Sequence, residues 1–509
     1  MSNTTENNKR IAKNTLLLYF RMLFTIIIGL YTSRIVLQTL GVNDYGIYNV
    51  VGGIVAMMSF LNAAMTQASQ RFIAFELGRQ NIQKLKEVFG TSVSIHLVIS
   101  SIIFIIAETI GLWFLNTHMN IENERMVAAN WVYQCSIFTF ICTIISVPYN
   151  ACIVAHEKMK AFAYISILET FLKLIIVYLL LIVKTDKLIA YAILLASVSL
   201  IIRIVYGIYC KKQFTECTYH FLFKRSLFKK MFSFACWSLI GSLGFSSKDQ
   251  AANIILNLFC GTAINAARGV ALQVNGIISN FSNNFIMALN PQITKQYAGG
   301  NITESIQLVY TGCRYSFYLL AIITIPIMIN IDYLLHLWLS TVPIYTSQFL
   351  QLALVSALIA SMASPLVTAI QATGNIKAFQ LSICIIMLFE LPLTYLTLKL
   401  KYEPYMVMMP TIFVTLIGLL ARIYLLKRLI KLYSLRFFTI NIVLKNICIA
   451  CICYFISKYI HNCFTINFIN FIITSLISFI ITSVGIISFG ISSKERIFLY
   501  NRIKSFYKK

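Results

Sequence analysis

Long, nearly uninterrupted runs of hydrophobic residues dominate the chain. A helix needs roughly 20 apolar residues to cross a bilayer core of about 30 Å, and fourteen stretches are long enough. They lie near residues 14–39, 46–69, 90–115, 127–154, 161–183, 187–209, 231–257, 263–289, 305–331, 345–370, 378–398, 405–426, 438–458 and 465–490. Strands of a transmembrane barrel would be about half as long, with alternating polar positions. The pattern therefore predicts an all-α polytopic membrane protein of about 14 transmembrane helices.

The composition fits a membrane protein. Of the 509 residues, 59% are hydrophobic and only 12% are charged, whereas about 25% are charged in an average soluble domain. Lys and Arg number 42 against 17 Asp and Glu, a net charge of +25. On a soluble fold that charge would suggest nucleic acid, but here the cations lie in loops between apolar runs. This excludes a soluble enzyme, a disordered protein and a secreted disulfide-rich domain, and it indicates contact with anionic membrane lipids rather than with nucleic acid.

The basic residues favour one side of the membrane. If the N-terminus is cytoplasmic, the inner segments carry 27 Lys and Arg and the outer loops carry 6. Because short cytoplasmic loops are enriched in these residues, both termini are expected to be cytoplasmic. The first ten residues are polar, and the first apolar run is too long for a signal peptide.

An internal repeat connects the two halves of the chain. Residues 148–162 (PYNACIVAHEKMKAF) and 365–379 (PLVTAIQATGNIKAF) share six identities in fifteen positions. A weaker similarity pairs residues 70–81 with 291–301, at a comparable distance of about 220 residues. A repeat of six helices keeps its orientation in the membrane, so the halves are expected to be related by an axis along the membrane normal.

This repeat predicts a division of the chain into four parts. Residues 1–215 form an N-lobe of helices 1–6, and residues 216–230 form a basic cytoplasmic linker. Residues 231–430 form a C-lobe of helices 7–12, and residues 431–509 hold helices 13–14 and a cytoplasmic tail. Pseudo-symmetric lobes of this kind place a binding site at their interface and rock between inward-open and outward-open states.

Charged and polar side chains form stripes on four of the predicted helices. Ionised side chains are expensive in hydrocarbon and usually face an internal cavity, so we expect three cations to bind substrate: Arg21, Lys248 and Arg268. Neither arginine has an acidic residue one turn away in the sequence. The other polar residues expected to line the cavity are Thr25, Asn62, Asp249, Asn253, Asn275 and Asn283. For single Ser, Thr and Asn residues the alternative is hydrogen bonding between helices.

The other intramembrane charges leave several alternatives open. Glu169 and Lys173 are spaced as an i, i+4 pair that neutralises itself. Lys248 beside Asp249 is either a salt-bridged switch or a cavity charge. Glu108 and Glu390 stand alone in the sequence and are candidates for a proton relay.

No cofactor or metal site is expected. The C-x-x-C-x-C run at residues 448–453 lies in an apolar helix without nearby His or carboxylate, and the other cysteines are interpreted as apolar filler. No GxxxxGK[ST] motif suggests the use of ATP. A cationic cavity rich in amides and hydroxyls suits an anion that carries many hydroxyl groups, such as a sugar phosphate. An exporter of cationic drugs would instead need acidic residues inside the lobes.

Three segments carry a resemblance to a known family. They are KNTLLLYFRMLFTIIIGLYTSRIVLQTLGVNDYGIYNVVGG near the N-terminus, ASQRFIAFELGRQN, and the loop at residues 148–162. Together they resemble bacterial polysaccharide flippases of the Wzx type, in the multidrug/oligosaccharidyl-lipid/polysaccharide (MOP) exporter superfamily. The resemblance implies two six-helix lobes, two C-terminal helices and a cationic central cavity, which maps onto Arg21, Lys248 and Arg268.

The same resemblance implies the function. Members of this type move an undecaprenyl-diphosphate-linked oligosaccharide across the bacterial inner membrane by alternating access, for O-antigen, lipopolysaccharide or capsule biosynthesis. The expected partners are the lipid-linked glycan and membrane lipids; a coupling ion, H⁺ or Na⁺, and a polysaccharide polymerase are further candidates. The alternatives are a MATE-like ion-coupled antiporter and a lipid II flippase. A membrane enzyme would need a large outer loop with catalytic Arg or His, and the outer loops are short, so no enzymatic activity is expected.

Overall fold

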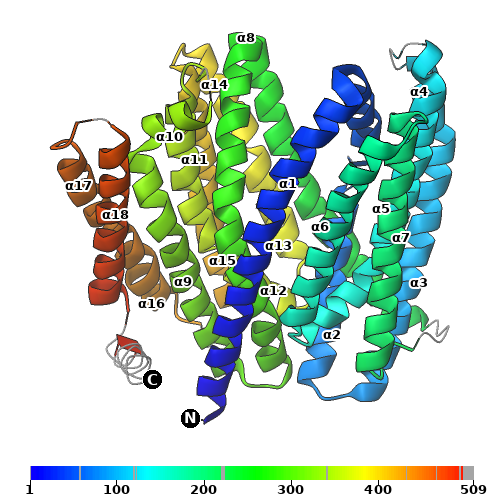
Figure 1. Ribbon diagram of the computed structural model, residues 1–509. Coiled ribbons are helices and arrows are strands. Elements are labelled where there is room, and N and C mark those ends of the chain that lie inside the picture. The colour runs from blue at the N-terminus through cyan, green and yellow to red at the C-terminus, as the bar shows by residue number, and fades with distance from the viewer. Residues whose placement is uncertain are drawn as a thin grey trace, which may run out of the picture. The chain divides into compact units, whose positions relative to one another are not determined.

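The computed structural model describes residues 2–56, 59–118, 121, 123–218, 224–339, 342–430, 433–465, 467–491 and 495–496, and these residues form helices and connecting loops without a strand (Figure 1). The α-helices are α1 (Ser2–Ala56), α2 (Ser59–Gly78), α3 (Ile82–Ile106), α4 (Leu112–His118), α5 (Met126–Ala155), α6 (Met159–Ile182), α7 (Lys187–Gln213), α8 (Arg225–Ala298), α9 (Ile302–Ile329), α10 (Ile331–Trp338), α11 (Thr346–Ser361), α12 (Ser364–Thr373), α13 (Lys377–Leu388), α14 (Glu390–Lys399), α15 (Met408–Leu429), α16 (Leu435–Phe438), α17 (Lys445–His461) and α18 (Phe468–Gly485). The short π- and 3₁₀-helical turns are η1 (Ala107–Gly111), η2 (Asn123–Arg125), η3 (Pro404–Val407), η4 (Thr439–Leu444) and η5 (Ile486–Gly490).

Eleven helical segments of the described chain are long and apolar enough to cross a membrane. Each coincides with one of the predicted spans, which confirms an all-α, multi-pass membrane protein. The other predicted spans, 46–69, 231–257 and 263–289, fall in α1–α2 and in α8. The described residues of these three segments are helical, and their sequences mix polar with apolar residues. These segments are not among the eleven helical segments that are apolar enough to cross a membrane.

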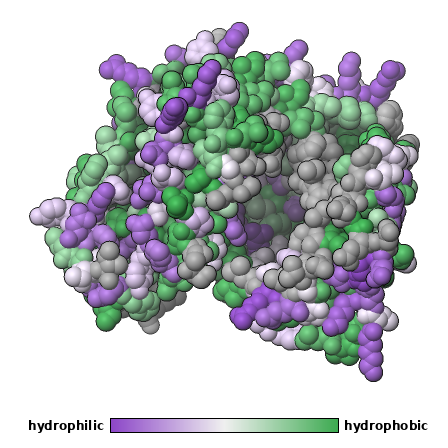
Figure 2. All heavy atoms as spheres, turned by 90° about the horizontal axis from the view of Figure 1, so that it is seen from above, coloured by the Kyte–Doolittle hydropathy of each residue, from purple (hydrophilic) through white to green (hydrophobic). Residues whose placement is uncertain are grey.

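Large apolar side chains reach the surface throughout the described chain. Ile182 is 75% exposed, Leu258 is 79% exposed and Tyr459 is 76% exposed. Figure 2 shows hydrophobic residues at the surface among hydrophilic ones. A chain that exposes so many large apolar side chains is suited to contact with lipid.

Two of the helices are interrupted by a glycine with positive φ. Gly41 (φ 78°, ψ 171°) divides α1, and Gly261 (φ 78°, ψ −177°) divides α8. Residues other than glycine rarely adopt this backbone conformation, so glycine is favoured at these two positions. Each glycine therefore provides the turn that was predicted between two consecutive spans.

The positive-φ positions show that the backbone repeats along the chain. Gly261 follows Gly41 by 220 positions, and Gly300 follows Gln80 by 220 positions. Glu157 and Gly374, which occupy equivalent places in the two similar segments 148–162 and 365–379, also both have positive φ. Turn geometry is thus preserved where the side chains are not, which supports the duplication indicated by the sequence.

The chain forms two compact units. Unit 1 comprises residues 1–243 and 294–301, and unit 2 comprises residues 244–293 and 302–509. The division passes through α8, whereas the lobes predicted from the sequence meet at residues 216–230. The first part of α8 belongs to unit 1 because its side chains pack there: the ring of Phe234 lies 5.6 Å from that of Phe72.

Unit 1 is organised around α5, which packs against α1, α2, α3 and α7. Tyr133 of α5 is fully buried, and its hydroxyl donates a hydrogen bond of 2.9 Å to the carbonyl oxygen of Ala107. Val132 and Leu188 belong to the same apolar cluster. This core packs the first turns of α5 and α7 together.

Unit 2 contains the C-terminal helices α17 and α18, both of which pack against α9. Asn330, at the end of α9, donates a hydrogen bond to Ser475 Oγ at 3.1 Å and accepts one from Thr474 at 3.0 Å. Hydrogen bonds of this kind attach one membrane helix to another. The predicted helices after residue 430 are therefore attached to the end of α9 through polar side chains of α18.

A buried carboxylate joins three segments of unit 1. Glu157, in the loop between α5 and α6, lies 2.8 Å from Arg10 Nε and 2.7 Å from Lys295 Nζ, and its side chain is 1% exposed. A Cβ atom at Gly78 would lie 2.8 Å from Lys295 Cα, so only glycine permits this approach of α2 to the end of α8. The ion pairs and the close packing explain why residues 294–301 belong to unit 1.

The start of α7 depends on one aspartate. Asp186 accepts hydrogen bonds from the backbone N–H groups of Leu188 (2.9 Å) and Ile189 (3.2 Å), which is the usual action of a helix N-cap. Its other oxygen lies 2.6 Å from Arg125, which also pairs with Asp44. Burial would raise the pKa of Asp186, but the bonds from Arg125 and the two N–H groups bring it below the usual 3.8.

Two substitutions at Asp186 separate its two roles. We expect Asp186→Ala to destabilise the protein by about 1 kcal/mol or more, because the cap is lost, and Asp186→Asn to cost less, because an amide oxygen still caps the helix. Since the folded-state pKa is depressed, the ionised carboxylate stabilises the fold above its unfolded pKa, and this contribution disappears as the pH falls below about 4. Thermal unfolding of the detergent-purified protein across pH measures both effects; equal midpoints for the two variants at neutral pH would contradict the capping role.

Candidate functional site

The intramembrane charges of unit 2 form a compact cluster. Lys248 of α8 and Glu390 at the start of α14 make a salt bridge of 2.9 Å, and their side chains are 5% and 1% exposed. Glu390 also accepts a hydrogen bond of 2.7 Å from Thr411 of α15. The prediction that Glu390 is a lone acid is therefore wrong, and Lys248 finds its acidic partner far along the chain.

The second cation of this cluster is Arg268. Arg268 is 2% exposed, and its guanidinium donates a hydrogen bond to Asn253 Oδ1. The turn at Gly261 brings these two side chains of α8 together. The Asp249 carboxylate interacts electrostatically with both Lys248 and Arg268. Two cations and two carboxylates thus lie close to one another, so this part of the candidate site is nearly neutral overall.

The third predicted cation belongs to unit 1. The Arg21 guanidinium lies 4.8 Å from the centre of the Phe162 ring, and its charge interacts with Tyr206. A cation over an aromatic ring is stabilised by the ring's negative face. Thr25, one turn further on, is exposed and donates its hydroxyl to the Arg21 carbonyl oxygen at 2.8 Å.

The predicted amide side chains differ in their surroundings. The Oδ1 atoms of Asn62 and Asn275 are buried and accept no hydrogen bond from the described residues. Asn283, in contrast, is exposed. Buried carbonyl oxygens without a partner are costly, so Asn62 and Asn275 are the amides best suited to accept hydrogen bonds from a ligand.

The structure places the predicted residues in two groups. Unit 2 holds Lys248, Asp249, Asn253, Arg268, Asn275 and Asn283. Unit 1 holds Arg21, Thr25 and Asn62. Each unit therefore contains a predicted arginine and also a buried amide oxygen without a hydrogen-bond partner among the described residues.

Two further intramembrane carboxylates, Glu169 and Glu108, have nearby partners. Glu169 pairs with Lys173 at 2.6 Å, which confirms the predicted i, i+4 ion pair. Glu108 lies in the π-helical turn η1 and accepts a hydrogen bond of 3.1 Å from Gln134. Neither residue takes part in the charge cluster of unit 2.

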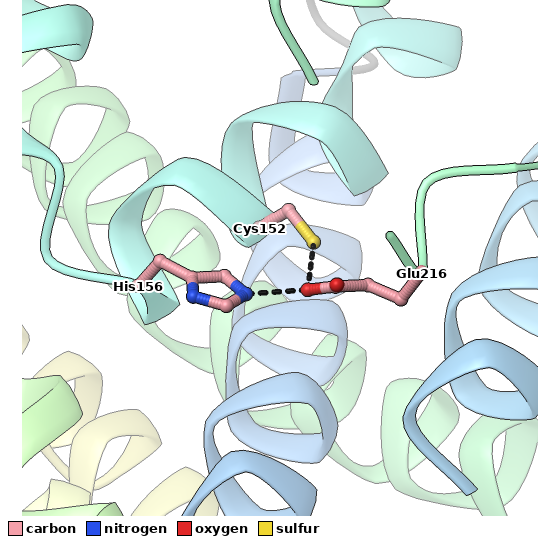
Figure 3. Close-up of side chains that lie close together, drawn as sticks. All are labelled: Cys152, His156 and Glu216. Atoms are coloured by element: carbon pink, nitrogen blue, oxygen red, sulfur yellow. Dashed lines mark hydrogen bonds and ion pairs between the residues drawn. The ribbon is translucent and has the colours of Figure 1, made fainter. Parts of the chain in front are cut away.

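One polar cluster was not predicted from the sequence. Cys152, His156 and Glu216 place a sulfur, a ring nitrogen and a carboxylate oxygen within 4.8 Å of one another. Figure 3 shows these three side chains pointing toward one another. The pKa of Glu216 is raised by burial, but the hydrogen bond with His156 brings it below its usual range. The spacing C-x-x-x-H places Cys152 and His156 on one face of a helix end and is the signal that the sequence offered.

A family model described as a polysaccharide biosynthesis protein matches residues 11–296, more than half of the chain. The chain belongs to this polysaccharide biosynthesis family. No curated protein matches it.

Several solved structures have a fold similar to that of this chain. A MATE protein in complex with MaD3S superposes with a TM-score of 0.71 at 13% identity, covering 83% of this chain and 97% of that one. A mutant of the Vibrio cholerae MATE transporter VcmN gives 0.69 at 16% identity, covering 86% and 100%. A MOP superfamily transporter from Pyrococcus furiosus, whose description refers to a binding pocket of reversed polarity, gives 0.63 at 11% identity, covering 82% and 96%. The polysaccharide biosynthesis family member thus has the fold of a MOP superfamily transporter.

Proposed function

We propose that this protein is a flippase that transfers an undecaprenyl-diphosphate-linked oligosaccharide to the outer leaflet of the bacterial inner membrane. The observation that carries the proposal is the combination of a polysaccharide biosynthesis family match with the fold of MOP transporters. A protein that belongs to a glycan assembly pathway and has a transporter fold is suited to move the glycan's lipid-linked intermediate.

The chemistry of the candidate residues supports an anionic, hydroxylated cargo. Arg21 and Arg268 offer planar forks of donors that suit the oxygens of a diphosphate. The Oδ1 atoms of Asn62 and Asn275, which accept no hydrogen bond from the described residues, suit sugar hydroxyls. The polyprenyl chain stays in the lipid, beside the apolar side chains that the helices expose.

Alternating access supplies the movement. The two lobes admit the charged head group from the cytoplasmic side, where the proposal places both termini, and then rock to expose it outside. Moving a negative charge out of a cell whose interior is negative is downhill by about 2.3 kcal/mol per charge per 100 mV. The glycan then passes to a polysaccharide polymerase.

A second candidate is an ion-coupled antiporter of the MATE type. The observation that favours it is the presence of Asp249 and Glu390 beside both cations of unit 2. Intramembrane carboxylates are the usual sites at which transporters bind H⁺ or Na⁺. The same carboxylates in a flippase would bind the coupling ion, so they do not by themselves decide the cargo.

Deletion of the gene in its host tests the proposal. We expect the strain to lose a surface glycan and to accumulate the lipid-linked oligosaccharide in the inner leaflet, and the wild-type gene to restore both. Normal glycan together with increased sensitivity to cationic drugs would support the antiporter instead. Arrest of cell-wall synthesis with accumulation of lipid II would identify lipid II as the cargo.

A further inference from the structure

Three potential metal ligands, from Cys152, His156 and Glu216, meet where α5 ends and the loop after α7 begins, and a fourth, Cys217, lies beside Cys152. Cys152 lies in the last turn of α5, and His156 caps that helix, with its N–H bonded to the Cys152 carbonyl oxygen at 2.9 Å. Glu216 and Cys217 follow α7 in a tight turn closed by the hydrogen bond from Cys217 N to Phe214 O (3.2 Å). All of these residues belong to unit 1.

Three of the donor atoms lie within 4.8 Å of one another, and the fourth, Cys217 Sγ, lies next to Cys152 Sγ. Glu216 Oε1 accepts a hydrogen bond from His156 Nε2 and lies 3.8 Å from Cys152 Sγ (Figure 3). Cys217 Sγ lies 3.5 Å from Cys152 Sγ. In a tetrahedral zinc site, bonds of about 2.0–2.3 Å separate the ligand atoms by roughly 3.3–3.8 Å. The sulfur–sulfur and sulfur–oxygen distances already fall at these values.

We propose that Cys152, His156, Glu216 and Cys217 bind one zinc ion. The metal takes the place of the proton in the hydrogen bond between His156 Nε2 and Glu216, and that proton passes to Nδ1 of the imidazole or to solvent. The two thiols release their protons to solvent when they become ligands. Two thiolates, an imidazole and a carboxylate are ligands that zinc accepts, and four protein ligands make a closed, structural site rather than a catalytic one.

The surroundings suit a structural site with an entry path. Cys152 is fully buried and Glu216 and Cys217 are 3% and 5% exposed, whereas the His156 side chain is 23% exposed. The imidazole stacks on the Phe214 ring at 4.2 Å, which fixes its plane. A metal can therefore enter past His156 and meet ligands that the fold already holds in place.

The site adjoins the ion pairs of Glu157. Glu157 is the next residue after His156, and its carboxylate joins Arg10 at the start of α1 to Lys295 at the end of α8. A metal that fixes His156 would also fix the loop that positions this carboxylate. Zinc binding would thus stabilise the contact among α1, the α5–α6 loop and the end of α8, whatever the cargo is.

Metal analysis of the full-length protein tests the inference. We expect protein purified in detergent without chelator to retain about one zinc per chain. Cobalt, used as a probe for zinc in the stripped protein, should give a thiolate charge-transfer band and the visible bands of tetrahedral coordination. Cys152→Ser and Cys217→Ser should abolish the charge-transfer band or reduce it strongly. Glu216→Gln and His156→Gln, which preserve size, should weaken cobalt binding at least tenfold, since even lost outer-shell partners cost 10–100-fold.

Exposed cysteines elsewhere provide the matched control. Cys448 and Cys451 are exposed in α17 and are spaced as C-x-x-C, so they would be the first to bind cobalt adventitiously. The double variant Cys448→Ser/Cys451→Ser should keep both the zinc and the band. A wild-type protein without a band, a band that survives in Cys152→Ser at full intensity, or a band lost in the α17 variant would each overturn the inference. If the cysteine variants do not fold, the cobalt affinities of Glu216→Gln and His156→Gln decide it.

Discussion

Replacing Arg268 with alanine is expected to reduce surface glycan at least tenfold in the complemented deletion strain, and Arg21→Ala is expected to do the same. A charge-assisted hydrogen bond contributes about 1.5–3 kcal/mol, and each 1.4 kcal/mol is a factor of ten in an equilibrium constant. Surface glycan and inner-leaflet lipid-linked oligosaccharide are measured in strains with equal membrane levels of each variant.

Two further variants show whether charge at these positions is what matters. Arg268→Lys keeps the charge but loses the planar fork, so we expect partial activity. Arg34→Ala is the control for Arg21→Ala, because Arg34 lies on nearly the opposite side of α1 and is exposed. Full activity of both Arg21→Ala and Arg268→Ala would make these arginines structural and would remove the cationic site from the proposal.

Replacing Lys248 with methionine is expected to destabilise the protein by about 3–5 kcal/mol, because the Glu390 carboxylate would remain buried without its cation. The side chains of this pair are 5% and 1% exposed, so water cannot replace the lost partner easily. The measurement is the thermal unfolding midpoint of the purified protein in detergent, with fluorescence-detected gel filtration as a check on folding.

A double variant and an exposed ion pair provide the controls. Lys248→Met/Glu390→Leu removes both charges and should recover much of the lost stability, since apolar residues of similar size can replace a buried pair. Lys173→Met breaks the exposed pair with Glu169 and should cost at most about 1 kcal/mol. A Lys248→Met protein as stable as the wild type would contradict this prediction and would show that Glu390 takes up a proton or finds another donor.

The helical architecture was predictable because hydrocarbon length and helix geometry act on local sequence. The apolar runs therefore located each of the spans found among the described residues. The short similarity between residues 148–162 and 365–379 was a sufficient guide to the repeat, which the backbone preserves in the positive φ of Glu157 and Gly374. The division into units was harder to predict from the sequence. Both ends of α8 belong to unit 1 because of the contacts of Phe234 and Lys295, which composition does not reveal.

The candidate site was only partly predictable. Helical periodicity identified the faces of Arg21, Arg268 and their amide neighbours, but it says nothing about partners on other helices. Glu390 is 142 residues from Lys248, and no local pattern links them. Similarly, Glu216 and Cys217 join Cys152 only after α5 and α7 have packed against one another. Interactions between distant segments are therefore what the structure adds to the sequence.

Flipping by the purified protein is the most direct test of the proposed function. Lipid-linked oligosaccharide extracted from the deletion strain would be reconstituted with the protein into liposomes, and its exposure to an added glycosidase would be followed over time under an imposed membrane potential. We expect wild-type protein to equilibrate the glycan between leaflets, and Arg21→Ala and Arg268→Ala to be at least tenfold slower. Glycan exposure in wild-type proteoliposomes no faster than in protein-free liposomes, with protein that is folded and correctly inserted, would contradict a flippase function.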